Sequence, residues 1–316
     1  MKPRILIAEP LDFSPRAAAI LSQSADVDYC LTPSDRLAEA FQEYDAVWIR
    51  LAARITADLL GSRPRTRVLA VPTTGLDHID LDACRERNVR VVSLRGETEF
   101  LRNVRATAEL TLALSLALLR NIPAAYASVL SGEWKRDHFR GHELYERTVG
   151  IVGVGRLGTI VAGYFRALGA RVLGYDPRTD FPHDAVERVL SLPELLASCD
   201  VVCLMVKYDD STRHLLGTQE FAGMKPGAIL VNTSRGGVVD ESAMLAALES
   251  GRLAGAALDV LDDEPHITLQ HRVVQYARQH ANVLVVPHIG GNTFESFEKT
   301  ETFLAKKLIA ELEAST

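Results

Sequence analysis

The sequence predicts an α/β protein made of two domains, each built on a parallel β-sheet, and three observations support this fold class. Its 316 residues are typical of a chain with two domains. Short apolar segments alternate with amphipathic segments along most of the chain, as strands and helices do in parallel-sheet proteins. A glycine-rich turn lies in mid-chain, so the long segment before it is expected to form a unit of its own.

The segment before the turn has its own α/β pattern. Its apolar runs are rich in Val, Ile, Leu and Ala, and Ser or Asp stands near the predicted helix starts, where these residues cap unpaired N–H groups. The predicted strands are residues 4–8, 46–49, 67–71 and 89–92, and the predicted helices are residues 14–22, 34–41 and 80–87. We therefore expect a parallel sheet in this part of the chain.

Residues 148–176, TVGIVGVGRLGTIVAGYFRALGARVLGYD, have the order strand, glycine-rich turn, helix, strand and acid. Gly153 permits the tight turn, Gly155 lets a pyrophosphate approach the backbone, and Gly158 lets the helix pack on the strand. The helix N-terminus directs unpaired N–H groups and a positive dipole end at the phosphates. Asp176 ends the second strand, where its carboxylate can bind an adenosine ribose. The pattern predicts an NAD site, and hence hydride transfer.

The acid also bears on the choice of dinucleotide. The carboxylate of Asp176 would repel the 2′-phosphate of NADP, so we expect NAD. Arg178 stands close by and could accommodate that phosphate, which keeps some use of NADP open. An ordinary βαβ turn without a ligand is the alternative, and the complete strand–helix–strand context argues against it.

The α/β pattern continues to the end of the chain. The predicted strands are residues 201–206, 228–232, 254–258 and 283–286, and the predicted helices are residues 191–198, 241–250 and 268–280. With the two strands around the glycine-rich turn, they are enough for a full dinucleotide-binding domain. Residues 293–313 form one long predicted helix, which we expect to pack on the first domain. Residues 110–119 are apolar on more than one face, so this helix is buried within one domain or at an interface.

Composition limits the possible partners and the location. The chain is 47% hydrophobic and 24% charged, with a formal net charge of −6, so we expect neither nucleic acid nor an anionic membrane surface as a partner. The N-terminal apolar run is too short for a signal peptide, and we expect a cytoplasmic protein. The four cysteines lack zinc-ligand spacing, so free thiols and no metal are expected.

Three residues after apolar strands are candidates for the chemistry, because ligands bind at the carboxyl ends of parallel strands. Arg235 could clamp a carboxylate through two parallel hydrogen bonds. Histidine is a common acid/base residue, so His288 could exchange a proton with a carbonyl oxygen, while the carboxylate of Glu264 could hold its tautomer. Taken singly, each could equally be a surface or turn residue, and it is their joint occurrence that points to catalysis.

With these residues the sequence resembles the D-isomer-specific 2-hydroxyacid dehydrogenases, a family that includes phosphoglycerate dehydrogenase. The motifs that carry the resemblance are TTGLDHID (73–80), NVRATAE (103–109), GVGRLG (153–158), NTSRGGVVD (232–240), ALDVLDDEP (257–265) and PHIGG (287–291). The resemblance implies two similar domains with doubly wound parallel sheets. An NAD-binding Rossmann domain, residues 101–289, would be inserted into a discontinuous flavodoxin-like substrate domain, residues 1–100 plus 290–316. The resemblance also implies a homodimer that forms through the cofactor domains.

The resemblance further implies a role for each motif residue. His288 would be the acid/base on the oxygen of a small D-2-hydroxy or 2-keto acid, Glu264 would hold it, and Arg235 would bind the substrate carboxylate. The implied cofactor-binding residues are Thr107, Gly153, Gly155, Arg156, Leu157, Gly158, Asp176, Val206, Thr233, Asp259 and Gly290. The implied further substrate-binding residues are Arg50, Thr74, Gly75 and Leu76.

Two departures from the family pattern concern the substrate. The loop SLRGETEFLR, residues 93–102, is longer and more charged than is usual in the family, and Leu51 replaces a common serine beside Arg50. The charges of this loop, such as those of Arg95 and Glu97, could shape the substrate pocket or lie in solvent. Both departures weaken the case for 3-phosphoglycerate as substrate.

Two other functions remain open. An NAD(H)-sensing binding module without catalysis would share the fold, and a phosphite-dehydrogenase-like enzyme would share the trio Arg235, Glu264 and His288. Formate dehydrogenases of the superfamily carry glutamine where Glu264 stands, which argues against that activity.

Overall fold

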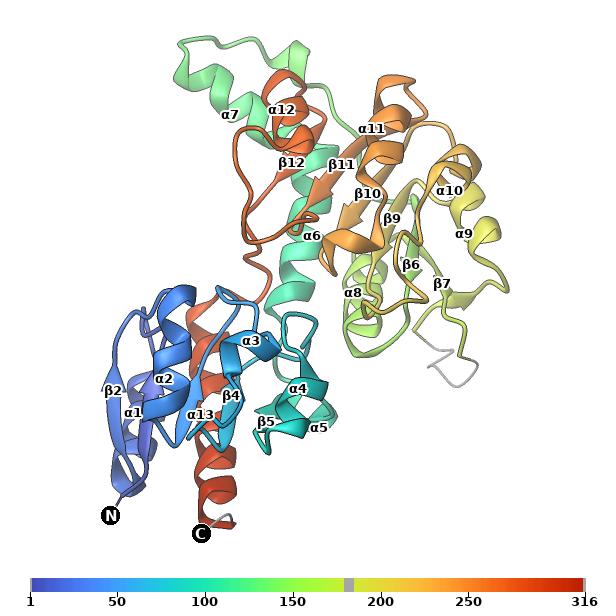
Figure 1. Cartoon of the computed structure of the whole chain (residues 1–316). Helices are drawn as coiled ribbons and strands as arrows, with labels where there is room; N and C mark the ends of the chain where they lie inside the picture. The colour runs from blue at the N-terminus through green and yellow to red at the C-terminus, as the bar shows by residue number, and fades with distance from the viewer. Residues whose placement is uncertain (1, 179–184, 315–316) are drawn as a thin grey trace. The chain divides into compact units, whose positions relative to one another are not determined.

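The chain divides into two compact units in the computed structural model, which describes residues 2–178 and 185–314 (Figure 1). Unit 1 comprises Met1–Val104 and Asn292–Thr316, and unit 2 comprises Arg105–Gly291. The chain therefore leaves unit 1 once, builds unit 2 as a continuous segment, and returns to unit 1. The predicted assignment of substrate to residues 1–100 plus 290–316 and of cofactor to 101–289 stays a prediction.

Unit 1 is built on a five-stranded parallel sheet in the order β2-β1-β3-β4-β5, the doubly wound order of flavodoxin-like folds. Its strands are β1 (Arg4–Ile7), β2 (Asp26–Tyr29), β3 (Ala46–Trp48), β4 (Val68–Val71) and β5 (Arg90–Ser93). Its helices are α1 (Pro15–Ser24), α2 (Leu37–Glu43), α3 (Ala57–Leu60), α4 (Leu81–Glu86), α5 (Thr98–Leu101) and α13 (Phe294–Ala314).

Helices cover both faces of this sheet, because alternate residues of each strand enter two different cores. Leu6 and Val47 pack with α2 and α4 on one face. The other face, which includes the fully buried Trp48, packs against α1 and α13. Helix α13 supplies Leu304 and Leu308 to that core, so the last helix of the chain completes the first unit. The predicted return of residues 293–313 to the first domain is confirmed (Figure 1).

Unit 2 is built on a seven-stranded parallel sheet in the order β12-β11-β10-β9-β6-β7-β8. Its strands are β6 (Thr148–Val152), β7 (Arg171–Tyr175), β8 (Glu187–Arg188), β9 (Val201–Leu204), β10 (Ala228–Asn232), β11 (Leu253–Leu258) and β12 (Val283–Val285). Its helices are α6 (Ala106–Leu119), α7 (Ile122–Leu130), α8 (Arg156–Ala167), α9 (Leu192–Ser198), α10 (Thr218–Gly223), α11 (Glu241–Glu249) and α12 (Arg272–Gln279). The strand order reverses at β6, which places the glycine-rich turn at the switch point where such sheets bind ligands.

Side-chain caps define several helix starts. The Ser14 hydroxyl accepts a hydrogen bond from Ala17 N before α1, Asp80 caps α4 through Ala83 N, and Asp240 caps α11. The caps lie where the sequence predicted helix starts, because short polar side chains satisfy the first unpaired N–H groups.

The predicted fold class is confirmed, and the differences are short or polar elements. Strand β2 was not predicted, because its sequence DVDY lacks an apolar run and its side chains are mostly exposed. Strand β8 was also not predicted, because it has only two residues, at one edge of the sheet of unit 2. It gives this sheet one strand more than the six expected. The apolar helix α6 packs against α8 and the sheet of unit 2.

Among the described residues no single helix is long and apolar enough to cross a membrane, although the bent pair Thr98–Leu119 and Ile122–Leu130 passes on length and composition.

Candidate cofactor and catalytic site

The glycine-rich turn joins β6 to α8 and leaves its backbone open to a ligand. Gly153 has a left-handed φ of +93°, and a Cβ there would lie 2.7 Å from the carbonyl oxygen of Met205. A Cβ on Gly158 would overlap the carbonyl oxygen of Gly153, so only glycine lets α8 pack this closely. A Cβ on Gly155 would have Arg178 Nη2 as its nearest heavy atom, 4.0 Å away, so there is space over the turn.

Asp176 follows β7 and closes this turn from the side. Its Oδ2 accepts a hydrogen bond from Val154 N at 3.0 Å, and Arg178 binds both carboxylate oxygens through Nε (3.1 Å) and Nη2 (3.2 Å). Burial opposes ionisation, but the bonds from Arg178 and Val154 outweigh it and hold the pKa of Asp176 below its ordinary value. The carboxylate is therefore an anion beside the turn, as a ribose-binding acid must be.

These features fit a dinucleotide. The open backbone at Gly155 and the N–H groups of Arg156 and Leu157 at the start of α8 would hold the pyrophosphate, and Asp176 would bind the ribose. Val206 lies against the turn, with Cγ1 3.0 Å from where a Cβ on Gly153 would stand.

The remaining predicted cofactor residues lie in the same unit. Thr233 follows β10 and shares a 2.7 Å hydrogen bond with Thr111 of α6. Thr107, in the first turn of α6, lies 3.2 Å from where a Cβ on Gly290 would stand. The close approach at Gly290 brings the chain after β12 next to the start of α6.

His288 and Glu264 form a direct pair at the carboxyl ends of β12 and β11. His288 Nδ1 lies 2.6 Å from Glu264 Oε2, and the two side chains are 25% and 28% exposed. The other oxygen, Oε1, accepts a hydrogen bond from Leu261 N at 2.7 Å. Because a carboxylate accepts at Nδ1, the Nδ1–H tautomer is favoured and Nε2 is left to exchange a proton with a substrate.

The backbone that carries His288 is strained, and Asp259 holds it in place. His288 has a φ of +53°, a left-handed conformation that is uncommon for residues other than glycine. The buried carboxylate of Asp259 accepts hydrogen bonds from Ile289 N (2.6 Å) and Gly290 N (2.9 Å), and its carbonyl accepts one from His288 N (2.8 Å). Burial raises the pKa of Asp259 despite these bonds. Both carboxylate oxygens thus bind the loop, a role that the sequence did not reveal.

Arg235 follows β10, the strand next to β11, so the three catalytic candidates lie at the carboxyl ends of three adjacent strands. Asn232 Nδ2 donates to the Arg235 carbonyl at 2.9 Å and fixes the turn after the strand. A Cβ on Gly236 would overlap the backbone of Leu261, so the segment with Arg235 packs directly on the one that leads to Glu264. Strand order and this close approach together bring the candidates to one edge of the sheet.

In unit 1 the predicted substrate residues Thr74, Gly75 and Leu76 follow β4. The Thr73 hydroxyl donates to the Gly75 carbonyl at 2.7 Å, which tightens the turn, and the side chain of Leu76 is buried. This turn therefore presents backbone at the carboxyl end of the sheet of unit 1.

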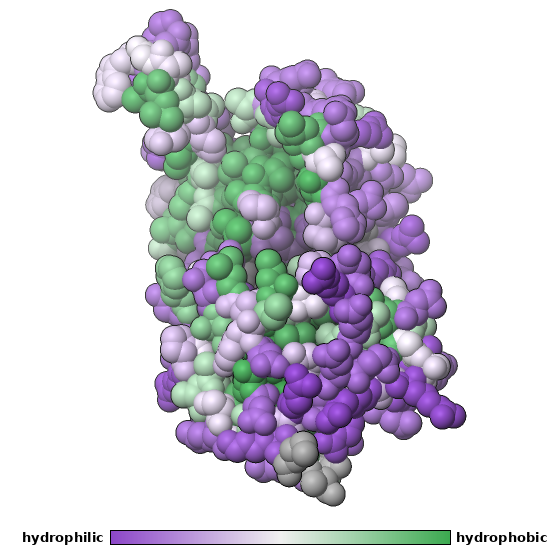
Figure 2. Space-filling model, turned by 60° about the vertical axis from the view of Figure 1, so that its left-hand side comes forward, coloured by the Kyte–Doolittle hydropathy of each residue, from purple (hydrophilic) through white to green (hydrophobic). Residues whose placement is uncertain are grey.

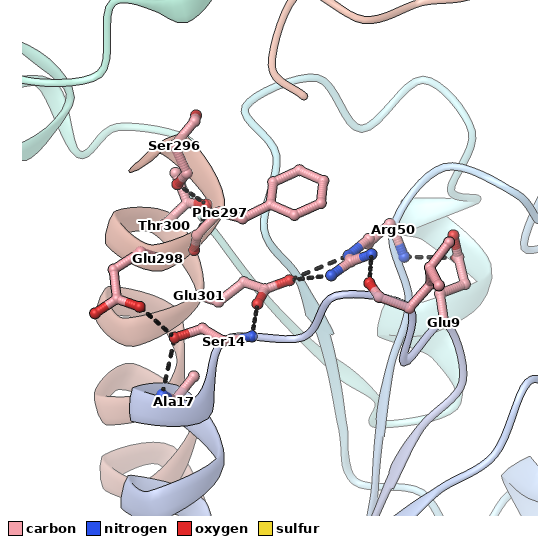
Figure 3. Close-up of polar contacts among 10 residues, drawn as sticks. Glu9, Ser14, Ala17, Arg50, Ser296, Phe297, Glu298, Thr300 and Glu301 are labelled. Atoms are coloured by element: carbon pink, nitrogen blue, oxygen red, sulfur yellow. Dashed lines mark hydrogen bonds and ion pairs between the residues drawn. The ribbon is translucent and has the colours of Figure 1, made fainter. Parts of the chain in front are cut away.

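Arg50 follows β3 and is bound within unit 1 (Figure 3). Its Nε and Nη2 lie 3.1 and 2.6 Å from Glu301 Oε1 of α13, and Nη1 donates to the Leu11 carbonyl at 2.8 Å. Its guanidinium stacks over the ring of Phe297, 4.3 Å from the centroid. The structure therefore shows Arg50 in a buried ion pair, and its predicted part in substrate binding stays a prediction.

Glu301 is the residue of this cluster that the sequence reading missed. It is fully buried, and its Oε2 accepts a hydrogen bond from Ser14 N at 2.7 Å. Burial raises the pKa of Glu301, while the bonds from Ser14 and Arg50 oppose that rise. A signal was available, because Glu301 shares the helix face of Leu304 and Leu308, at the i+3 and i+7 spacing of a buried stripe.

The unusual loop at residues 93–102 is anchored in unit 1. Lys307 of α13 bonds to Glu97 at 2.5 Å, and Phe100 of α5 stacks on Phe303 with ring centroids 4.1 Å apart. Arg95 Nε lies 3.4 Å from the Thr74 carbonyl, so the loop contacts the turn after β4. Glu97 is therefore part of an ion pair, whereas Arg95 is exposed.

The chain matches a family model and is similar to named dehydrogenases and reductases. Residues 112–290 match the family model of the D-isomer specific 2-hydroxyacid dehydrogenase NAD binding domain. The chain is 36% identical over 310 residues to D-3-phosphoglycerate dehydrogenase of Mycobacterium bovis, which covers 97% of this chain and 56% of that protein. It is 31% identical over 312 residues to hydroxypyruvate reductase of Thermotoga maritima, covering 98% of each.

A solved structure shows the same relationship. D-lactate dehydrogenase of Aquifex aeolicus, complexed with NAD and lactic acid, is 27% identical and superimposes with a TM-score of 0.85 over 98% of this chain and 96% of that one. The chain spans about half the length of several phosphoglycerate dehydrogenases that it matches. The matched domain and the fitting turn identify NAD as the cofactor. The chain belongs to the D-isomer specific 2-hydroxyacid dehydrogenase family.

Proposed function

We propose that the protein is an NAD-dependent oxidoreductase that interconverts a small D-2-hydroxy acid and its 2-keto acid. The observation that carries this proposal is the 2.6 Å contact of His288 with Glu264. The two residues follow the adjacent strands β12 and β11, and β11 is next to β10, which leads to Arg235. A proton donor, its carboxylate partner and a carboxylate-binding cation are the groups that reduction of a keto acid requires.

Each of these residues has a definite part in the proposed reaction. When bound, NADH supplies the hydride for the keto carbon. The guanidinium of Arg235 binds the substrate carboxylate and polarises the carbonyl. His288 donates its Nε2 proton to the keto oxygen in reduction and accepts the hydroxyl proton in oxidation. Glu264 stabilises the imidazolium through Nδ1–H.

A substrate screen tests this function. NADH oxidation would be followed by absorbance with glyoxylate, hydroxypyruvate, pyruvate, bulkier 2-keto acids and phosphorylated three-carbon acids. We expect turnover of at least one keto acid to the D-hydroxy acid, identified by chiral chromatography. Tight NADH binding without turnover of any member would instead support a sensing module, and oxidation of phosphite alone would support a phosphite dehydrogenase.

The preference for NAD over NADP is proposed to depend on Asp176. Replacing Asp176 with alanine removes the anion that would repel the 2′-phosphate of NADPH. We expect the ratio of kcat/KM for NADH to that for NADPH to fall by about tenfold or more, since each 1.4 kcal/mol of lost repulsion changes the ratio about tenfold. Glu187→Ala is the matched control, because Glu187 is an exposed acid paired with Arg171 away from the turn. An unchanged ratio in Asp176→Ala would contradict the role given to Asp176.

We further propose a homodimer that forms through α7 of unit 2. No residue of this nine-residue helix is buried, and Ile122, Tyr126, Val129 and Leu130 are 53%, 66%, 48% and 69% exposed. Apolar surface is visible toward the top of Figure 2, at the height at which α7 lies in Figure 1. Monomeric proteins rarely expose such a cluster, and the same helix on a second copy provides a complementary apolar surface.

The variant Tyr126→Glu/Val129→Glu tests the dimer. We expect the wild-type mass in light scattering after size exclusion to be twice that of the variant, because two buried charges would oppose association. Leu190→Glu is the control, since Leu190 is an exposed apolar residue of unit 2 outside α7. A monomeric wild-type protein would exclude this interface.

The predicted cytoplasmic location and the predicted absence of nucleic-acid and membrane partners stay predictions.

A further inference from the structure

Unit 2 contains a second histidine–carboxylate pair that the proposed reaction does not use. Glu241 is the first residue of α11, and His271 directly precedes α12. His271 Nε2 lies 3.3 Å from Glu241 Oε2, and the two side chains are only 14% and 17% exposed. Arg272 donates to the hydroxyl of Ser242 at 2.9 Å beside them, so the starts of α11 and α12 are tied twice.

The remaining oxygen of Glu241 reaches the segment that leads to Glu264. Glu241 Oε1 accepts a hydrogen bond from Asp262 N at 2.9 Å. The preceding amide, Leu261 N, donates to Glu264 Oε1 at 2.7 Å. Two successive backbone amides are thus bound by two carboxylates, one from α11 and one that contacts His288. A shift of this segment would move both bonds together.

Gly236 contacts the same segment. A Cβ at Gly236 would overlap the carbonyl carbon of Leu261 and the amide of Asp262, so the two backbones are in direct contact. Gly236 directly follows Arg235, so this contact joins the segment with Arg235 to the segment with Glu264. The bond from Glu241 keeps the segment seated against Gly236.

The environment of Glu241 disfavours its ionised form, and His271 reduces this effect. Burial raises the pKa of Glu241, and the charges of Asp262 and Asp263 act in the same direction, whereas the bond from Asp262 N and the nearby His271 oppose the rise. A partly buried carboxylate near two aspartates is unfavourable unless it is paired. His271 is that partner at Oε2, while Oε1 accepts the bond from Asp262 N.

We propose that Glu241, held by His271, is a positioning residue of the reaction. It fixes the 261–264 segment so that Glu264 contacts His288 Nδ1 while the segment stays packed against Gly236, next to Arg235. The proposal rests on the proposed function of Glu264 and His288. It assigns Glu241 an effect on proton transfer without contact with the substrate.

The test is a double-mutant cycle with Glu241→Ala and Glu264→Gln. We expect Glu241→Ala to lower kcat for keto-acid reduction by roughly 10-fold, in the range known for displaced catalytic groups, with KM for NADH nearly unchanged. The pH above which reduction declines should move downward, because a misplaced Glu264 no longer favours protonated His288. In the Glu264→Gln background the same alanine change should alter kcat less than about twofold, since the group that it positions is already altered.

Conservative and control variants complete the design. Glu241→Gln keeps an oxygen for Asp262 N and should restore most of kcat, while Glu249→Ala, an exposed acid at the far end of α11, should match the wild type. Equal losses of kcat in both backgrounds, or an unmoved pH profile in Glu241→Ala, would overturn the positioning role. If Glu264→Gln itself leaves kcat and the pH profile unchanged, the proposed function of Glu264 has failed instead. If Glu241→Ala does not fold, His271→Gln replaces it in the test. We expect the same downward shift of the pH profile in this variant, and an unshifted pH profile would reject the proposal.

Discussion

Replacing His288 with alanine should lower kcat for keto-acid reduction by roughly 10²- to 10⁴-fold, the scale of general acid–base catalysis. The structure supports a loss of this size because Glu264 holds His288 Nδ1 at 2.6 Å, which leaves Nε2 to deliver the proton. No other histidine is paired with this carboxylate in the described part of the chain. Steady-state NADH oxidation, with the best substrate from the screen, measures the loss.

Two further measurements separate chemistry from folding. NADH binding, followed by fluorescence titration, should be nearly unchanged in His288→Ala, because the glycine-rich turn lies on another strand. His280→Ala is the control, since His280 is exposed and stacks on Tyr276 at the end of α12. Turnover within a few-fold of wild type in His288→Ala would exclude His288 as the acid/base.

Replacing Glu301 with alanine should destabilise unit 1 by about 3–5 kcal/mol, the range for breaking one side of a buried ion pair. The change leaves the guanidinium of Arg50, only 14% exposed as a side chain, without its carboxylate, and it removes the acceptor for Ser14 N (Figure 3). Urea unfolding followed by tryptophan fluorescence is a suitable measurement. Of the two tryptophans Trp48 is fully buried in unit 1 and Trp134 is 86% exposed, so the signal reports on unit 1.

Variants at the same cluster show whether the ion pair is responsible. Glu301→Gln keeps an acceptor for Ser14 N and should lose less stability than the alanine variant. Glu298→Ala removes an exposed acid that contacts only the Ser14 hydroxyl among its described side-chain bonds, and should change stability by less than about 1 kcal/mol. Equal unfolding midpoints for Glu301→Ala and Glu298→Ala would show that the pair does not stabilise the unit.

The sequence predicted the parts of the fold that depend on local patterns. Apolar runs identified the central strands, and the spacing of Gly153, Gly155 and Gly158 located the switch point of the second sheet. The rule that ligands bind at the carboxyl ends of parallel strands selected Glu264 and His288, which the structure brings into contact. This succeeded because the three strands concerned are adjacent in the sheet as well as ordered in the chain.

Features that depend on distant contacts could not be predicted in this way. The ion pair of Arg50 could not be predicted, because its partner Glu301 lies about 250 positions later, on a helix whose docking depends on the whole of unit 1. Asp259 shows no local sign that both its oxygens bind the loop after β12. Strand β2 is polar, so its pairing with β1 follows from sheet extension rather than from burial of its own side chains.

The discontinuity of unit 1 has a consequence for the order of events on the ribosome. Residues 2–104 emerge before unit 2, but one core of their sheet lacks Leu304, Leu308 and Leu312 until the segment that follows unit 2 has been made. Unit 2 is continuous in sequence and can close while unit 1 still exposes the apolar face that α13 will cover. Unit 1 therefore begins first and finishes last, and in that interval its uncovered face is open to aggregation and to chaperones that bind exposed apolar surface.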